Sequence, residues 1–345
     1  MITGNAPVHA ERWGADEFFG GLGKTQRLSR WTPSGRITFQ DDILGVQPVV
    51  DVRIRYGRWY SFRTVRTNSR GEFSGRRRRT KARYKIEWRA NDFKLKKHSS
   101  IRKSYSKSVW NKHLTGKDAL CAVVWVAARE YFYGDIDGLS RPRKKTARLR
   151  INVRDDSHDE GWLGYHRAWL IGTKVEMFLK RNGVYRSPSQ VYAVAVHELA
   201  HNAHYRNFEK ISDRWTRDRE WRKEIESIIK ESFATGIEWY FCIKRYGKNT
   251  LEFNYSTDYT GIVEDLIDTD ISYASRGGGF APGNLRNKTE RVSGFTIKQI
   301  ENALFKSNTW NQFRDNLKAD YPSRSGGPRY TEREIDNLFA NWGNI

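Results

Sequence analysis

The chain has 345 residues, enough for two domains with a sizeable buried core. Aromatic residues make up 14% of it, which excludes a largely disordered chain, and the lack of any long apolar run excludes a membrane-spanning helix. The net charge of +22 predicts non-specific attraction to polyanions. The two cysteines, Cys121 and Cys242, lie in apolar segments, so a metal site would have to use histidines and carboxylates.

The N-terminal part of the sequence predicts a linker followed by a small β-domain. Residues 1–35 are rich in glycine and have no periodicity, so we expect a leader or linker there. Residues 36–97 contain short runs of alternating apolar and polar residues broken by Gly and Asn, which is typical of antiparallel strands. Two basic runs, Arg76–Arg79 and Arg141–Lys145, are consistent with either a polyanion-binding patch or two solvated loops.

The remainder, residues 98–345, predicts an α+β domain. Residues 119–128 are apolar nearly all round, which indicates a buried helix that Gly134 should end. The segment Ala147–Arg154 alternates strictly and predicts a strand, and more strand material follows it. After about residue 250 the pattern favours a helical subdomain that completes the domain.

A later segment carries the strongest chemical motif in the sequence. The residues Ser187-Pro188-Ser189-Gln190 are typical of a helix start, so the motif that follows should be helical. On such a helix His197 and His201, four residues apart, leave the same face and can bind one tetrahedral ion. This is the His-Glu-x-x-His arrangement, in which two neutral imidazoles hold zinc and Glu198 takes a proton from a metal-activated water.

A catalytic zinc site needs a third protein ligand and an open fourth position. His204 shares the face, but at 1.5 Å per residue it lies about 10 Å along the axis from His197. A cleft-lining or packed position therefore suits it better than a ligand position. The alternative is a carboxylate on an amphipathic helix predicted from Trp221 to about Gly247, where three glutamates recur every seven residues on one face: Glu224, Glu231 and Glu238.

The motif and this second helix together resemble the glutamate-zincins, zinc metallopeptidases whose third ligand comes from a helix after the motif helix. Within that family, Glu231-Ser232-Phe233-Ala234 resembles the Glu-x-Phe-Ala element of the anthrax-lethal-factor-like group. The resemblance covers about Thr115 to Gly247. It implies that Glu231 is the third zinc ligand, that Glu238 supports the site from behind, and that Ala147–Arg154 is the edge strand that binds an extended peptide.

The predicted β-domain also carries a family resemblance. It is similar to the carboxypeptidase-regulatory-like, transthyretin-like sandwich modules that precede bacterial secreted enzymes. The matching pieces are Gly45-Val46, Val52-Arg53-Ile54, the turn 67–73 and Tyr84-Lys85-Ile86-Glu87-Trp88. The resemblance implies a β-sandwich over residues 36–97 and favours a secreted or cell-envelope location. Residues 1–14, however, have neither the basic start nor the apolar core of a signal peptide.

Taken together, these features predict a zinc metalloendopeptidase that hydrolyses peptide or protein substrates. Glu198 would act as general base and later return the proton to the leaving amine. His204, Tyr205 and Tyr240 are candidates for stabilising the oxyanion. Asp265 could orient a ligand histidine, although a surface position is the more common fate of an aspartate.

Two other functions fit parts of the sequence. A basic nucleic-acid-associated protein with a structural or accessory metal site would explain the charge, and a strongly salt-dependent affinity for DNA would support it. No recognised nucleic-acid-binding motif is present, however. A non-catalytic zincin used as a binding module is the second alternative, and the intact Glu198 argues against it.

Overall fold

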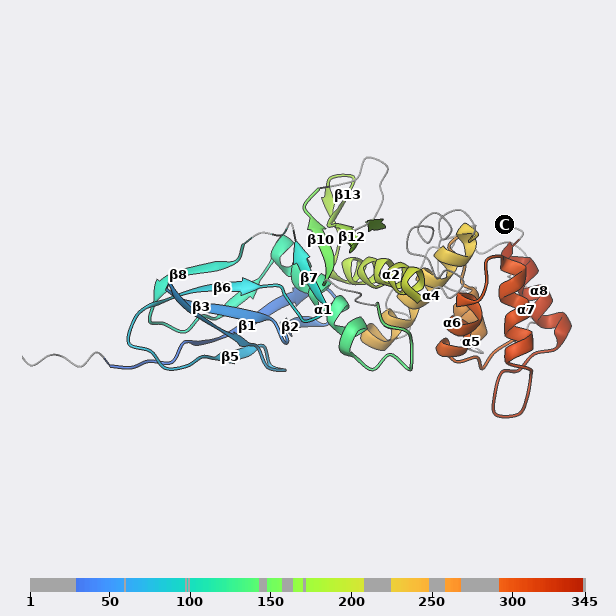
Figure 1. Ribbon diagram of the computed structural model, residues 1–345, viewed down its shortest axis with the longest axis horizontal. Coiled ribbons are helices and arrows are strands. Elements are labelled where there is room, and N and C mark those ends of the chain that lie inside the picture. Colours follow the sequence, from blue (N-terminus) through green and yellow to red (C-terminus); the bar gives the residue numbers. More distant parts are fainter. Residues whose placement is uncertain are drawn as a thin grey trace, which may run out of the picture.

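The computed structural model has a β-rich end, a central layer of sheet and helices, and a helical end (Figure 1). The expected α+β class is therefore confirmed. Only the backbone is described for residues 164–169 and 172–174, and the expected leader lies mostly outside the described part of the chain. The described residues are 29–58, 60–96, 98, 100–142, 148–156, 164–169, 172–207, 225–247, 258–267 and 292–343.

The β-rich end consists of two four-stranded sheets. One has the order β2 (Gly45–Pro48), β1 (Ser34–Asp41), β5 (Glu72–Ser74), with β9 (Lys112–Leu114) also paired to β1. The other has the order β4 (Ser61–Arg66), β3 (Arg53–Arg58), β6 (Ala82–Glu87), β8 (Arg102–Ser106). In these two sheets every pair between strands of residues 36–97 is antiparallel, as the alternation predicts, and only β9, from beyond that range, pairs in parallel with β1.

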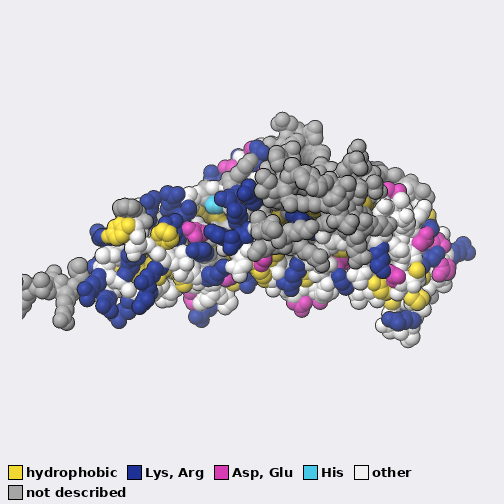
Figure 2. Space-filling model, viewed as in Figure 1, with side chains coloured by type: hydrophobic (Ala, Val, Ile, Leu, Met, Phe, Trp, Pro, Cys, Tyr) yellow, Lys and Arg dark blue, Asp and Glu magenta, His cyan; other side chains and the backbone are white. Residues whose placement is uncertain are grey.

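Period-two alternation places apolar side chains between the two sheets and basic side chains outside. On β3, Ile54 and Tyr56 are buried, while Arg53 and Arg55, which alternate with them, are partly exposed. Aromatic rings from both sheets meet in the core: Tyr84 lies 6.0 Å from Phe73 and 5.2 Å from Trp110, measured between ring centroids. Lysine and arginine side chains are prominent on the visible face of this end of the molecule (Figure 2).

Strand pairing crosses the domain boundary expected at residue 97. Strands β8 and β9 come after that residue, yet they pair with β6 and β1 of the β-rich end. Conversely, β7 (Phe93–Lys96) comes before it and pairs in parallel with β10 (Leu149–Arg154). The two parts of the chain are therefore interleaved rather than consecutive.

The central sheet has the order β11 (Gly164–Trp169), β12 (Gly172–Phe178), β10, β7. Strand β10 corresponds to the segment expected as an edge strand, but it lies between β12 and β7, so that expectation is wrong. The physical reason is the non-local pairing with β7. Among the described strands β11 forms the edge next to β12 and runs antiparallel to it. A hairpin of β13 (Lys180–Arg181) and β14 (Val184–Tyr185) then leads to the motif helix.

The helical segments predicted from the sequence are among the helices of the described part of the chain. They are α1 (Gly116–Tyr133), α2 (Pro188–Asn207), α4 (Ser227–Tyr246), α5 (Ile262–Ile267), α6 (Ile297–Phe305), α7 (Trp310–Asp320) and α8 (Glu332–Gly343). Helix α1 is buried nearly all round and ends at Gly134, as predicted. Helix α2 has the expected capping box, in which the Gln190 amide donates to Ser187 Oγ and the Ser187 amide donates to Gln190 Oε1. None of these helices is long and apolar enough to cross a membrane.

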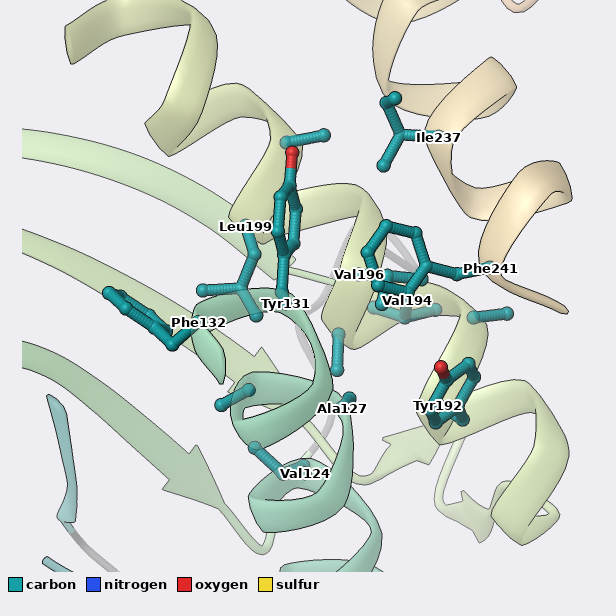
Figure 3. Close-up of a cluster of buried hydrophobic side chains, with 14 of the residues drawn as sticks. Val124, Ala127, Tyr131, Phe132, Tyr192, Val194, Val196, Leu199, Ile237 and Phe241 are labelled. Atoms are coloured by element: carbon teal, nitrogen blue, oxygen red, sulfur yellow. The ribbon is translucent and has the colours of Figure 1, made fainter. Parts of the chain in front are cut away.

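Helices α1, α2 and α4 enclose a common apolar core (Figure 3). Tyr131 of α1, Val196 of α2 and Phe241 of α4 are all buried there, and the Tyr131 and Phe241 rings lie 4.9 Å apart. Because closely packed interiors resist displacement, this core fixes the positions of α2 and α4 relative to each other.

Candidate metal centre

Helices α2 and α4 pack directly against each other and bring the predicted metal-binding side chains together. Glu231 and Glu238 are two turns apart on α4, and both contact His197 on α2. Between them Ala234 is completely buried and Thr235 nearly so. Small side chains at these positions allow the two helix backbones to approach closely.

One ligand atom from each of His197, His201 and Glu231 lies within 4.8 Å of the other two. Glu231 Oε2 is 3.3 Å from His197 Nε2 and 3.1 Å from His201 Nε2. In a tetrahedral zinc site with metal–ligand bonds of about 2.0–2.1 Å, neighbouring ligand atoms are about 3.3 Å apart. Both distances from the Glu231 oxygen match this spacing, and two imidazoles with one carboxylate are a donor set that suits zinc.

Glu238 contacts the opposite side of the same imidazole. Its Oε2 is 3.0 Å from His197 Nδ1, the nitrogen that does not face Glu231. A carboxylate in this position accepts a hydrogen bond from the protonated Nδ1. This bond fixes the orientation of the ring and leaves Nε2 as the ligand atom. The two glutamates thus contact different nitrogens of one imidazole.

The electrostatics of the cluster favour a positive charge at its centre. Burial lowers the pKa of His197, but the carboxylates of Glu231 and Glu238 outweigh it and raise that pKa to about 10. Burial alone would raise the pKa of Glu231, yet His201 and His197 hold it well below its usual value. A site that binds a proton this strongly also suits a divalent cation, which would take the place of the proton.

Glu198 lies between the two histidines in sequence and has a different environment. Its side chain is buried, and burial raises its pKa to about 6, although the histidines pull the pKa in the opposite direction. Among the described residues its Oε2 has no hydrogen-bond partner. A buried carboxylate with an uncommitted oxygen and a pKa near neutrality is suited to accept a proton.

Tyr259 is a site residue that the sequence analysis did not identify. Its ring stacks on the His197 imidazole with centroids 5.9 Å apart and planes 22° apart, and 41% of the residue stays exposed. Burial, the charges of Glu231 and Glu198, and a hydrogen bond with Glu231 all raise its pKa, which keeps the phenol protonated. The phenol is thus a hydrogen-bond donor beside the cluster.

A close helix approach brings Tyr259 to this place. Gly236 on α4 faces Val263 on α5, and a Cβ atom added at Gly236 would lie only 2.4 Å from the Val263 side chain. Because glycine has no side chain, α5 can pack directly on α4 and carry the preceding residue 259 to the histidines. Nothing near Tyr259 in the sequence signals this packing.

The other predicted tyrosines and His204 have different surroundings. His204 is completely buried, stacks on Phe305 at 5.2 Å and meets Phe233 edge-on at 5.6 Å, and burial lowers its pKa to about 3. It is packed in the core, one of the two alternatives expected for it. The described contacts of Tyr205 are with Arg206, and those of Tyr240 are with Lys244 and Phe241.

Asp265 is buried, so the surface position that we favoured for it is wrong. Its Oδ2 accepts a hydrogen bond of 2.9 Å from Trp342 Nε1, which ties α5 to α8. The reason is that α8, from the far end of the chain, covers the face of α5 on which Asp265 lies. Glu224, the third glutamate of the heptad series, lies outside the described residues.

The turn between β1 and β2 holds both ligand-bearing helices. The Asp42 carboxylate accepts hydrogen bonds from the Ser189 amide at 2.7 Å and the Ser189 hydroxyl at 2.6 Å, at the start of α2. The neighbouring Asp41 is buried, 3.7 Å from Arg245 and 3.3 Å from the Tyr246 hydroxyl, near the end of α4. Carboxylates complement both an N-terminal helix dipole and a buried arginine.

Comparison with known proteins adds no relative: no family model, no curated protein and no solved structure matches the chain.

Proposed function

We propose that the chain is a zinc-dependent endopeptidase of the glutamate-zincin type. The observation that carries the proposal is that one Glu231 oxygen lies 3.3 Å from His197 Nε2 and 3.1 Å from His201 Nε2, distances that suit neighbouring ligands of one tetrahedral zinc ion. When bound, Zn²⁺ would polarise the carbonyl of a peptide bond and lower the pKa of a water molecule. In this assignment His197, His201 and Glu231 hold the ion.

Glu198 is the general base in this proposal. Its Oε2, which has no partner among the described residues, accepts the proton of the attacking water and passes it to the leaving amine nitrogen. The pKa of about 6 supports this role because the carboxyl group is ionised at neutral pH yet basic enough to take a proton. Acidification through this pKa protonates the base, so hydrolysis should fall as the pH decreases below about 6.

Tyr259 would stabilise the negative oxygen that develops at the scissile carbonyl. Support comes from its position over the His197 ring, from its partial exposure and from the raised pKa that keeps its proton in place. Tyr259 takes the place of two of the predicted candidates, because His204 packs against Phe305 in the core and the Tyr240 ring contacts Lys244.

The substrate would add as a strand to β11. This strand pairs with β12 on one side, lies at the sheet edge among the described strands and contacts α2. An edge strand offers free backbone groups that recognise an extended peptide through main-chain hydrogen bonds. The two sheets of the β-rich end would correspond to the transthyretin-like sandwich module, extended beyond residue 97 by β8 and β9.

The first prediction tests the metal and the base together. Purified protein should contain one zinc per chain, and Glu198→Gln should keep that zinc while losing peptide hydrolysis by several orders of magnitude. Elemental analysis and hydrolysis of a quenched-fluorescence peptide library measure the two properties. Well under one zinc per chain after reconstitution, or an active Glu198→Gln variant, would contradict the proposal.

A further inference from the structure

The positive charge of this protein is concentrated at its β-rich end. Residues 29–114 contain 23 Lys and Arg but only 6 Asp and Glu, a net charge of +17 within a chain whose total is +22. The remaining residues are close to neutral for their length. The metal cluster lies on α2 and α4, outside this range, so the peptidase chemistry does not account for the charge.

Part of this charge lies on the outer face of the sheet formed by β4, β3, β6 and β8. On β3 and β6 the inner-facing residues are buried, and the alternate residues form three cross-strand rows on the other side. These rows are Phe62, Gly57 and Arg83; then Thr64, Arg55, Lys85 and Arg102; then Arg66, Arg53 and Glu87. We call these residues the outer β-face. It contains six basic side chains and one acidic one.

The acidic residues neutralise only one end of the outer β-face. Glu87 lies 3.3 Å from Arg53 and 3.8 Å from Arg55, and Asp51 next to the face lies 3.2 Å from Arg66. Among the described residues no carboxylate pairs with the remaining three basic side chains, which are Arg83, Lys85 and Arg102. Their charge is therefore available to an anionic partner.

Exposed aromatic rings lie among these uncompensated charges. Phe62 is 48% exposed, and the Arg55 guanidinium lies 3.3 Å from its ring centroid. Tyr105 lies in the β-bulge of β8 opposite Arg83 and is 45% exposed. Tyr60, in the turn between β3 and β4, is 61% exposed and accepts a hydrogen bond of 2.7 Å from Arg58. Large exposed rings that gather within a basic surface are typical of a ligand that has both planar groups and negative charge.

From this arrangement we infer that the outer β-face binds single-stranded nucleic acid. Arg83, Lys85 and Arg102 contact phosphates, and Phe62 and Tyr105 stack on unpaired bases. A duplex fits less well because its bases are already stacked on one another. Sulfated polysaccharides and anionic lipid surfaces match the charge but offer no planar group for the rings. This binding is independent of zinc and of hydrolysis, and it goes beyond the proposed peptidase function.

The test is fluorescence anisotropy of the full chain with a labelled mixed-sequence single-stranded oligonucleotide, over a range of salt concentrations. One variant combines Arg83→Ala, Lys85→Ala and Arg102→Ala. Its matched control, which removes the same charge from the helical end, combines three exposed arginines: Arg324→Ala, Arg329→Ala and Arg333→Ala. A third variant combines Phe62→Ala and Tyr105→Ala. Circular dichroism and thermal unfolding check that each variant is folded.

We expect the basic triple variant to lose at least tenfold more affinity for the oligonucleotide than its control does. It should also reduce the slope of log affinity against log salt by about 2, since each single-strand phosphate contact contributes about 0.7. Removal of the two rings should weaken single-strand binding roughly tenfold or more while changing duplex binding little. Equal losses in the basic triple variant and its control would overturn the inference. So would a ring variant with unchanged single-strand affinity, or binding of heparin or anionic vesicles without binding of the oligonucleotide.

Discussion

Glu231 and Glu238 are the same residue type on the same face of α4, yet they contact different nitrogens of His197. Glu231 also lies 3.1 Å from His201 Nε2, so it can share a metal ion with both histidines, whereas Glu238 can act only through His197. Their positions relative to the imidazole, not their chemistry, assign them different roles.

This difference gives the second prediction. Glu231→Gln should release zinc in competition with a chelator and abolish hydrolysis, because a neutral amide is a poor zinc ligand. Glu238→Gln should keep most of the zinc and reduce affinity or activity by about 10- to 100-fold, since it only orients a ligand histidine. Zinc release from Glu238→Gln combined with retention by Glu231→Gln would reverse the two assignments.

The third prediction concerns Tyr259. If its phenol donates a hydrogen bond to the oxyanion, Tyr259→Phe should lower kcat about 10²- to 10³-fold, with zinc content and KM little changed. The phenylalanine keeps the stacking on His197, so the variant removes only the hydroxyl group. A matched Tyr240→Phe variant, whose ring contacts Lys244 rather than the histidines, should have nearly normal activity. Equal effects of the two substitutions would count against the assignment.

At the scale of the elements, the motif helix depends on a cap from outside its own segment. Local sequence provides the capping box of Ser187 and Gln190, and Asp42 of the β1–β2 turn adds a second acceptor at Ser189. Helix α4, in turn, is held near its end by Asp41. The β-rich end therefore helps to position both helices that carry the candidate metal-binding residues.

The fourth prediction follows from that cap. Asp42→Ala should lower the free energy of unfolding by about 1 kcal/mol, as loss of an N-terminal helix cap usually does. Asp42→Asn should lose less, because the amide oxygen can still accept a hydrogen bond from the Ser189 amide. Urea denaturation of the metal-free protein measures both values. Two variants that are as stable as the parent would show that the turn does not cap α2.

At the scale of the whole molecule, the chain passes between its two halves more than once. After β6 the chain leaves the β-rich end, and β7 joins the central sheet. The chain then returns, and β8 and β9 each pair with one of the two sheets of the β-rich end. The buried residues of both halves belong to one continuous core. Cutting such a chain at a single point removes strands from both sides of the cut.

The fifth prediction is that a fragment of residues 36–97 does not fold cooperatively. It lacks β8, which pairs with β6, and β9, which pairs with β1, and it leaves β7 without its partner β10. Unpaired strands expose backbone groups and apolar side chains to water, which favours aggregation over folding. Urea unfolding followed by tryptophan fluorescence should show a sigmoidal transition for the full chain and none for the fragment. A fragment that unfolds cooperatively would instead support the domain boundary at residue 97 that the alternation pattern predicts.

The features that the sequence determined by itself depend on neighbouring residues. The spacing of His197 and His201, the capping box of α2 and the glycine that ends α1 involve residues within a few positions of one another. Backbone geometry relates such residues in a fixed way, so a pattern of residue types is enough to predict them. The heptad spacing likewise predicts that Glu231 and Glu238 share a face.

Only the tertiary structure decided the features that depend on distant segments. Tyr259 reaches His197 because Gly236 lets α5 pack on α4, Asp265 is buried because α8 covers it, and β10 is an inner strand because β7 pairs with it. No local pattern encodes which segments meet, because that choice is made by the burial of apolar surface over the whole chain. The same holds for the outer β-face, whose basic and aromatic side chains form one surface only when β4, β3, β6 and β8 pair in their observed register.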